Sequence, residues 1–273
     1  MNRGAVALLQ AGEPACATTL AIKMIESFTS RSTPSGSKNP RANRNSAPAV
    51  DAALSKTLSD LSDTYIRCRD ESNHGLGPDD DGGEKIWLPQ LLIFLRAACK
   101  FAAGTPSLHA RYARALTAAG QDARASKHFA LANIPQEYAA SLKVWATKGF
   151  ASEKDLFFAR AVLHMLTIPG KEAQAAQLYQ ALGAPSMTPV DNIVSMLLEL
   201  LDMTTKGHRV GREGGKQSFA VLREMYGPIL RLRDHRTLSL FDRVGQVQFH
   251  WDPPRSAMQS MMQNVMKMFD PQP

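Results

Sequence analysis

The stretch that decides the fold is LTAAGQDARASKHF, Leu116–Phe129, in which a leucine, a glycine, an alanine and an aromatic ring stand at fixed intervals. The order within the frame is leucine, glycine, alanine, and finally an aromatic or a small residue. The same frame recurs at Leu166–Tyr179 (LTIPGKEAQAAQLY) and at Leu8–Ala21 (LLQAGEPACATTLA). A frame that recurs in this way is typical of chains built from repeated supersecondary units.

Each position of the frame has a physical role in a pair of antiparallel helices. The glycine turns the chain between the helices, the alanine lets them approach closely, and the ring fills the space between pairs. The frame is similar to that of the tetratricopeptide repeat, although its spacing differs from that family's period of about 34 residues. No stretch alternates with period two for long enough to predict a sheet. We therefore predict an all-α fold, a right-handed superhelical α-solenoid of tetratricopeptide-like helical pairs.

The same reading predicts a single α-solenoid domain over residues 1–273. Ser32–Pro48 and Ser72–Glu84 hold too few apolar residues to offset the cost of ordering, so we predict two flexible insertions. Thr204–Gly215 is predicted to be a basic, glycine-rich loop or hairpin excursion. Ser256–Phe269 is predicted to be an amphipathic helix, which caps the preceding pair, fills a partner's groove or lies on a membrane surface. Its apolar face comprises Met258, Met261, Met262, Val265, Met266 and Phe269.

The positive charge of the chain has two interpretations, a solvated loop and solvated helix faces or a surface for an acidic partner. The formal net charge is +7 and the isoelectric point is about 9.4, and residues 206–243 hold nine Lys/Arg against four Asp/Glu. No aromatic residue lies between Lys206 and Lys216, so this segment offers no platform for stacking bases. No apolar run approaches the 20 or so residues of a membrane span. We expect a cytosolic protein without nucleic acid and without direct membrane insertion.

No motif indicates catalysis or a bound cofactor. His109, His128 and His164 lie in predicted helices and show no metal-ligand spacing with one another or with a cysteine, so we interpret them as packed or surface residues. The phosphate-binding and nucleophile-elbow motifs are absent from the sequence. The sequence therefore predicts a non-enzymatic protein with no catalytic residue, no metal and no cofactor. The three cysteines are interpreted as buried, inert thiols in a reducing cytosol: Cys16, Cys68 and Cys99.

A second informative stretch is FDRVGQVQFHWDPP, Phe241–Pro254, which reads as a helix stopped by a double proline. Its glycine, Gly245, costs about 1 kcal/mol relative to alanine in the middle of a helix. Gly245 lies beside the apolar stripe of that helix and has no turn signal around it. We predict a close-packing point, where the absent side chain lets another backbone approach.

Four motifs in ordered succession resemble the Golgi to ER traffic protein 4 family. Asp242–Gln246 with Phe249 and Pro253-Pro254 is similar to a signature near the C-terminus of that family. The resemblance is clear over residues 87–254 and extends weakly over residues 7–28. It implies a scaffold that takes part in delivering tail-anchored membrane proteins to the endoplasmic reticulum. The other motifs are a helix junction at Tyr226, Pro228 and Leu230, the stretch Lys148–Phe157, and the turn Gly104–His109.

The resemblance also implies partners. The C-terminal half would hold a ubiquitin-like-domain subunit or a BAG-family scaffold, and the N-terminal half of the family docks the targeting ATPase. The family carries helices upstream of what is Met1 here, so we expect an N-terminally truncated chain that lacks part of the ATPase surface. Two alternatives remain open, a basic helical-repeat protein that binds RNA and another tetratricopeptide-like adaptor.

We predict the partner site on the C-terminal third, as a groove with a basic rim and an apolar floor. Such a groove suits an amphipathic partner helix that carries acidic residues. The predicted partner-binding residues are Lys206, Arg209, Arg212, Phe219, Leu222, Tyr226, Leu238, Phe241, Arg243 and Phe249.

Overall fold

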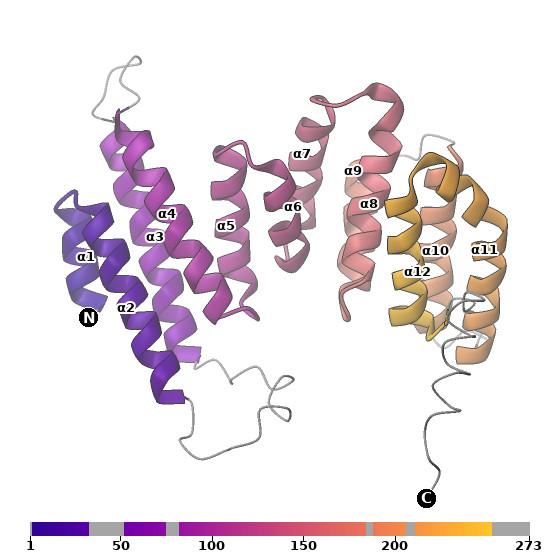
Figure 1. Ribbon diagram of the computed structural model, residues 1–273, viewed down its shortest axis with the longest axis horizontal. Helices are drawn as coiled ribbons and strands as arrows, with labels where there is room; N and C mark the ends of the chain where they lie inside the picture. Colours follow the sequence, from indigo (N-terminus) through magenta and orange to yellow (C-terminus); the bar gives the residue numbers. More distant parts are fainter. Residues whose placement is uncertain (1, 33–51, 75–81, 184–187, 206–210, 253–273) are drawn as a thin grey trace, which may run out of the picture. The chain divides into compact units, whose positions relative to one another are not determined.

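Among the described residues every regular element is a helix (Figure 1). The computed structural model describes residues 2–32, 52–74, 82–183, 188–205 and 211–252. The chain divides into two compact units, Met1–Trp145 and Ala146–Pro273. The predicted all-α class is confirmed, and within each unit the helices stack as pairs, as an α-solenoid requires.

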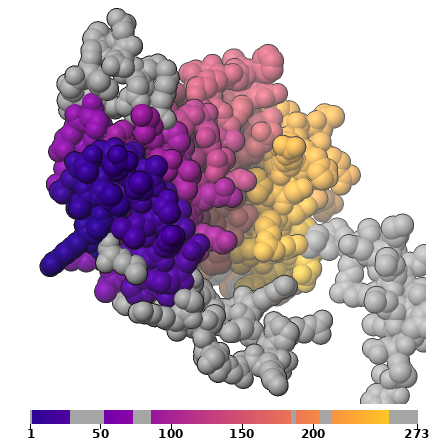
Figure 2. Space-filling view, turned by 60° about the vertical axis from the view of Figure 1, so that its left-hand side comes forward, coloured from indigo at the N-terminus to yellow at the C-terminus, as the bar shows by residue number. Residues whose placement is uncertain are grey.

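Unit 1 is built from helical pairs that pack on one another. Its helices are α1 (Asn2–Gln10), α2 (Pro14–Ser32), α3 (Ala52–His74), α4 (Gly82–Phe101), α5 (Pro106–Ala118), α6 (Asp122–Leu131) and α7 (Pro135–Ala146). Helix α1 packs on α2, α3 on α4 and α5 on α6, while α2–α4 and α4–α5 contacts join successive pairs. In the space-filling view the indigo surface of α1 and α2 adjoins the purple surface of α3 (Figure 2). Each pair thus buries a face that it could not bury alone.

Unit 2 is organised around one central helix. Its elements are η1 (Ala151–Glu153), α8 (Lys154–Leu166), α9 (Glu172–Leu182), α10 (Pro189–Thr205), α11 (Arg212–Arg233) and α12 (His235–Phe249). Helix α8 contacts α9, α10 and α12, and α11 lies against both α10 and α12. The outer helix α11 therefore has one face in the core of unit 2 and one face directed away from it.

The repeated frame has the structural role that its spacing predicts. Gly12, Gly120 and Gly170 have φ angles of 79°, 68° and 78°, a left-handed conformation that costs other residues energy. No heavy atom lies within 4 Å of a Cβ placed at any of the three, so backbone conformation, not crowding, requires glycine there. The alanines of the frame are completely buried where the paired helices meet: Ala17, Ala125 and Ala175.

Several helices extend further than the sequence indicated. Helix α3 continues to His74 and α4 begins at Gly82, so the two ends of the predicted insertion at 72–84 are helical, and its middle, residues 75–81, lies outside the described residues. Of the predicted excursion at 204–215, only residues 206–210 lie outside them. Polar residues can continue a helix past the last residue that packs, because the hydrogen bonds are internal to the backbone. The predicted helix at 256–269 and residues 33–48 lie outside the described residues altogether.

Pro228 does not mark a junction between helices, as the resemblance had implied, because it lies inside the continuous helix α11. A proline removes the N–H that would bond to the carbonyl four residues earlier, here that of Glu224. Both residues are exposed, so water can hydrate that carbonyl. The helix therefore tolerates the proline on its outer face.

Candidate protein-docking surface

Three of the predicted rim residues cannot be placed. Lys206 and Arg209 lie outside the described residues, and so does the side chain of Arg212, the first residue of α11. Arg243 is exposed on α12 and donates a hydrogen bond to Oε1 of Gln246 at 3.1 Å. The basic rim therefore remains a prediction from the sequence.

The predicted apolar floor forms the core between α11 and α12. Phe219 is completely buried, and the centroid of its ring lies 4.8 Å from that of Phe241, 5.2 Å from that of Phe249 and 5.3 Å from that of Trp251. Leu238 is 3% exposed on the same side of α12. We call the four rings at 219, 241, 249 and 251 the aromatic cluster. In this structure their side chains, and that of Leu238, pack within unit 2 and are not accessible to a partner.

Gly245 lies directly against this cluster. A Cβ at this position would stand 2.3 Å from Cε1 and 2.5 Å from Cζ of Phe219, and 3.0 Å from Cε3 of Trp251. The predicted close approach is therefore present, but an aromatic ring makes it and not another backbone. The glycine is needed because α11 presents its largest buried side chain at this point.

The helix ends before the double proline, and its ending completes the cluster. His250 adopts the left-handed conformation with φ 51°, and the N–H of Trp251 donates to the carbonyl oxygen of Gly245 at 3.0 Å. A residue in the left-handed conformation is a common way for a chain to leave a helix C-terminus. The turn at His250 carries the ring of Trp251 back onto Phe219, a contact that extension of the helix to Pro253 would have prevented.

The outer face of α11 carries an exposed apolar stripe that the sequence reading did not identify. Val221, Met225 and Leu232 are separated by four and seven residues, so they lie along one face of the helix, with Ile229 beside them. Their exposed fractions run from 36% at Ile229 to 89% at Leu232, where a packed helix would show values near zero. We call these four residues the α11 stripe. An exposed apolar stripe on a helix is a surface that another protein can cover.

Two of the predicted residues border this stripe. Leu222 and Tyr226 are half-buried on α11, and the hydroxyl of Tyr226 donates to Sδ of Met196 on α10 at 3.6 Å. Met196 and Met203 of α10 are 43% and 42% exposed. The apolar surface therefore continues from α11 towards α10, and methionine side chains adapt readily to a partner's shape.

Ion pairs hold α11 and α12 in place and leave a positive surface. Arg223 pairs with Asp242, and Arg233 donates to Oδ1 of Asp155 at 3.0 Å. Residues 212–249 hold seven Lys/Arg against four Asp/Glu. Since Arg231 and Arg236 are exposed, the surface around the α11 stripe carries an excess of positive charge.

Asp234 makes a separate set of bonds at the start of α12. It caps the N-terminus of α12 by accepting hydrogen bonds from the backbone N–H groups of Arg236 and Thr237, and Arg160 of α8 donates to it at 2.9 Å. Burial acts to raise the pKa of Asp234, but the bonds from Thr237, Arg160 and the two backbone groups outweigh burial and lower it to about 2. One carboxylate thereby ties α8 to the turn between α11 and α12.

In the part of the chain that the structure describes, no helix is both long and apolar enough to cross a membrane.

The comparisons with known proteins agree on one family. The family model described as "Golgi to ER traffic protein 4" matches residues 1–269. The Golgi to ER traffic protein 4 homolog of Oryzias latipes is 29% identical over 184 residues, which cover 62% of this chain and 53% of that protein. The homolog of Homo sapiens is 29% identical over 191 residues with the same coverage.

The match to these relatives thus spans about half of their length. A crystal structure of C. therm. Get4 superposes with a TM-score of 0.60 at 17% identity, covering 96% of this chain and 79% of that one. At that identity the superposition shows the fold alone.

Proposed function

This chain belongs to the Golgi to ER traffic protein 4 family, and we propose that it is a non-enzymatic scaffold subunit in the cytosolic delivery of tail-anchored membrane proteins to the endoplasmic reticulum. Family membership supports a role in traffic between the Golgi and the endoplasmic reticulum. The narrower role rests on the ordered motifs of the sequence and on a fold whose units offer helical faces to other proteins.

The observation that carries the proposal is the open α11 stripe. A partner that laid an amphipathic helix along α11 would remove Val221, Met225 and Leu232 from water. Burying one such side chain contributes about 1.5–3 kcal/mol. An acidic edge on the partner helix would face the excess positive charge around the stripe and speed encounter. The proposed partner that would bring such a helix is the ubiquitin-like-domain subunit or a BAG-family scaffold.

The predicted groove is revised in one respect. The proposed contact surface consists of the α11 stripe with Leu222 and Tyr226 at its border, and the buried aromatic cluster supports it from beneath. Lys206, Arg209 and Arg212 stay in the proposal as the basic rim. Bridging to the targeting ATPase is the second part of the proposed role, and it is supported by the family resemblance alone.

The test is binding of the recombinant partner to the full chain and to stripe variants. Met225→Glu and Leu232→Glu place a carboxylate where an apolar contact is proposed, so each should raise the Kd about tenfold or more. Val144→Glu on α7 is the matched control, because Val144 is 60% exposed and Met225 62% exposed. Circular dichroism checks that all variants stay helical.

Unchanged affinity in both stripe variants would remove α11 from the interface.

A salt titration distinguishes the RNA-binding alternative from the proposed scaffold role. RNA affinity would fall by orders of magnitude between low and moderate salt, whereas the contact through the apolar stripe would lose mainly association rate and far less affinity.

A further inference from the structure

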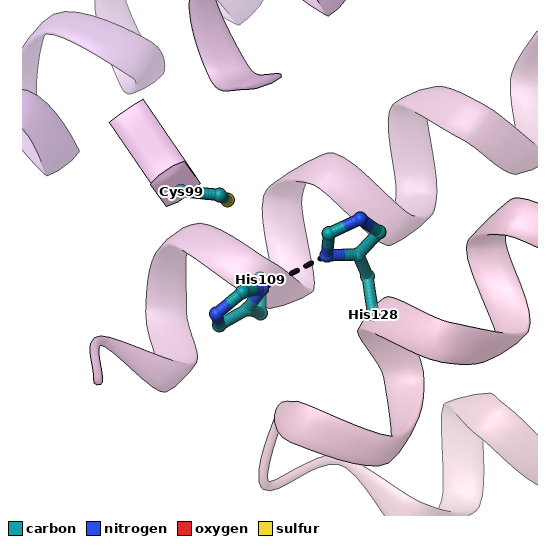
Figure 3. Close-up of side chains that lie close together, drawn as sticks. All are labelled: Cys99, His109 and His128. Atoms are coloured by element: carbon teal, nitrogen blue, oxygen red, sulfur yellow. Dashed lines mark hydrogen bonds between the residues drawn. The ribbon is translucent and has the colours of Figure 1, made fainter. Parts of the chain in front are cut away.

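Three side chains that commonly bind metal ions meet inside unit 1, far from the docking surface in the sequence. Cys99 comes from α4, His109 from α5 and His128 from α6 (Figure 3). The Cys99 sulfur and one ring nitrogen of each histidine all lie within 4.8 Å of one another. Cys99 and His109 are buried and His128 is half-buried. Sequence spacing did not reveal this group, because the three residues lie on three different helices.

The hydrogen bonds around the histidines orient them as metal ligands are oriented. Nε2 of His109 lies 2.9 Å from the carbonyl oxygen of Ala103, and because a carbonyl only accepts, Nε2 is the donor. Nδ1 of His109 then carries a lone pair when the ring is neutral, and it faces Nδ1 of His128 at 2.9 Å. Metal-binding histidines regularly donate their second nitrogen to a backbone carbonyl in this way, which fixes the tautomer and the ring orientation.

We propose that Cys99, His109 and His128 form a binding site for Zn²⁺ or a similarly thiophilic divalent cation. The cation takes the place of the hydrogen that lies between the two Nδ1 atoms, and the Cys99 thiol gives its proton to solvent. The displaced hydrogen of His128 is carried on Nε2 instead. Water fills the fourth position, so the donor set is one thiolate, two imidazoles and one water, which Zn²⁺ accepts.

The distances are close to those that the cation needs. Zn–N bonds of about 2.0–2.1 Å and a tetrahedral angle place two nitrogen ligands about 3.4 Å apart, and a Zn–S bond of about 2.3 Å places sulfur about 3.6 Å from each nitrogen. The two Nδ1 atoms stand at 2.9 Å, and the sulfur lies within 4.8 Å of one ring nitrogen of each histidine. Shifts of roughly 0.5–1.2 Å, within the reach of side-chain rotations, close the site.

The protonation states at neutral pH favour binding at the imidazoles. Burial lowers the pKa of His128 to about 4, with further lowering by His109, Arg124 and Lys127, so the ring is neutral and can act as a ligand. Burial raises the pKa of Cys99 to about 12, so without a cation this side chain is a neutral thiol. Arg124 and Lys127 repel a further cation near His128, and the Cys99 thiolate that forms on binding offsets this repulsion. Affinity for the ion should therefore depend strongly on Cys99.

The surroundings assign the site a structural role. The ring centroids of Tyr112 and His128 lie 4.4 Å apart, and Arg124 donates a hydrogen bond to the Tyr112 hydroxyl at 3.0 Å. These contacts hold His128 in place. The ion would join α4, α5 and α6 at one point and stabilise unit 1 in proportion to its concentration relative to the Kd.

The experiment is a Co²⁺ titration of the full chain after chelator treatment, followed by displacement with Zn²⁺. We expect one ion per chain, the visible absorption of tetrahedral Co²⁺ and an ultraviolet charge-transfer band from the thiolate. Cys99→Ser should abolish the charge-transfer band and lower Co²⁺ affinity about 100-fold. His128→Asn should lower affinity comparably, and Zn²⁺ should raise the melting temperature of the wild type but not of these variants.

Matched cysteine variants make the result independent of whether the ligand variants fold. The thiol of Cys16 on α2 is exposed and not buried as predicted from the sequence, whereas that of Cys68 on α3 is buried. Cys16→Ser and Cys68→Ser should both keep the Co²⁺ spectrum. Retention of the charge-transfer band in both assigns it to Cys99. A wild-type chain that binds neither Co²⁺ nor Zn²⁺ at one equivalent, or a Cys99→Ser variant that binds as tightly as wild type, overturns the proposal.

Discussion

Substituting Gly245 by alanine tests the packing of unit 2 at its tightest point. Helix propensity favours the change by about 1 kcal/mol, so a glycine that had no packing role would be stabilised by it. The added Cβ would instead stand 2.3 Å and 2.5 Å from two ring carbons of Phe219, where carbon atoms normally stay about 3.5–4.0 Å apart. The ring would have to retreat by more than 1 Å.

That retreat is blocked on the other sides. Phe219 is completely buried, and its ring already contacts those of Phe241, Phe249 and Trp251. Overpacking of this kind costs about 1–3 kcal/mol, and the close contacts put Gly245→Ala at the upper end. Subtracting the gain in propensity leaves a net loss of about 2 kcal/mol. The melting temperature should fall by about 4–8 °C.

The assay is thermal and urea unfolding of a double-mutant cycle with Phe219→Leu, which removes the ring atoms that the new Cβ would meet. In the Phe219→Leu background Gly245→Ala should cost at least about 1 kcal/mol less than in wild type. Gly4→Ala is the control, because Gly4 is an exposed helical glycine whose Cβ would meet only Cδ2 of Leu20 at 3.3 Å. A higher melting temperature for Gly245→Ala, or an equal cost in both backgrounds, would refute the steric account.

Three further outcomes are expected. Deleting residues 33–48 should leave helix content and melting temperature nearly unchanged in circular dichroism, since the segment carries no apolar face, and a large loss of helix would contradict this. Replacing Lys206, Arg209 and Arg212 together by Glu should slow partner association and reverse its salt dependence, and unaltered kinetics would exclude the loop from the interface. Asp234→Asn should lower the free energy of unfolding by about 2 kcal/mol at pH 7. Because the folded-state pKa is depressed to about 2, this contribution is present above pH about 4 and is lost as the pH falls towards 2, so the unfolding curves of wild type and variant should converge there.

The α11 stripe shows where periodicity stopped being informative. The apolar spacing of Val221, Met225 and Leu232 was visible in the sequence. Apolar residues at helical spacing usually lie in the core, and α11 has another apolar side that does lie in the core. Phe219 and Leu230 are buried, whereas Leu232 is 89% exposed. Which side a helix buries depends on which helices lie beside it, so only the fold separates the two.

The sequence by itself determined the helical pairs and their turns. Gly12, Gly120 and Gly170 adopt left-handed backbone because each must reverse the chain within a few residues, and Asp234 caps α12 through neighbours two and three residues away. These features depend on local geometry, which spacing along the chain expresses directly. Only the tertiary structure decided that a ring fills the space beside Gly245 and that Cys99 meets two histidines. Those contacts join residues on separate helices, and their existence depends on how whole helical faces pack, which no local pattern in the chain specifies.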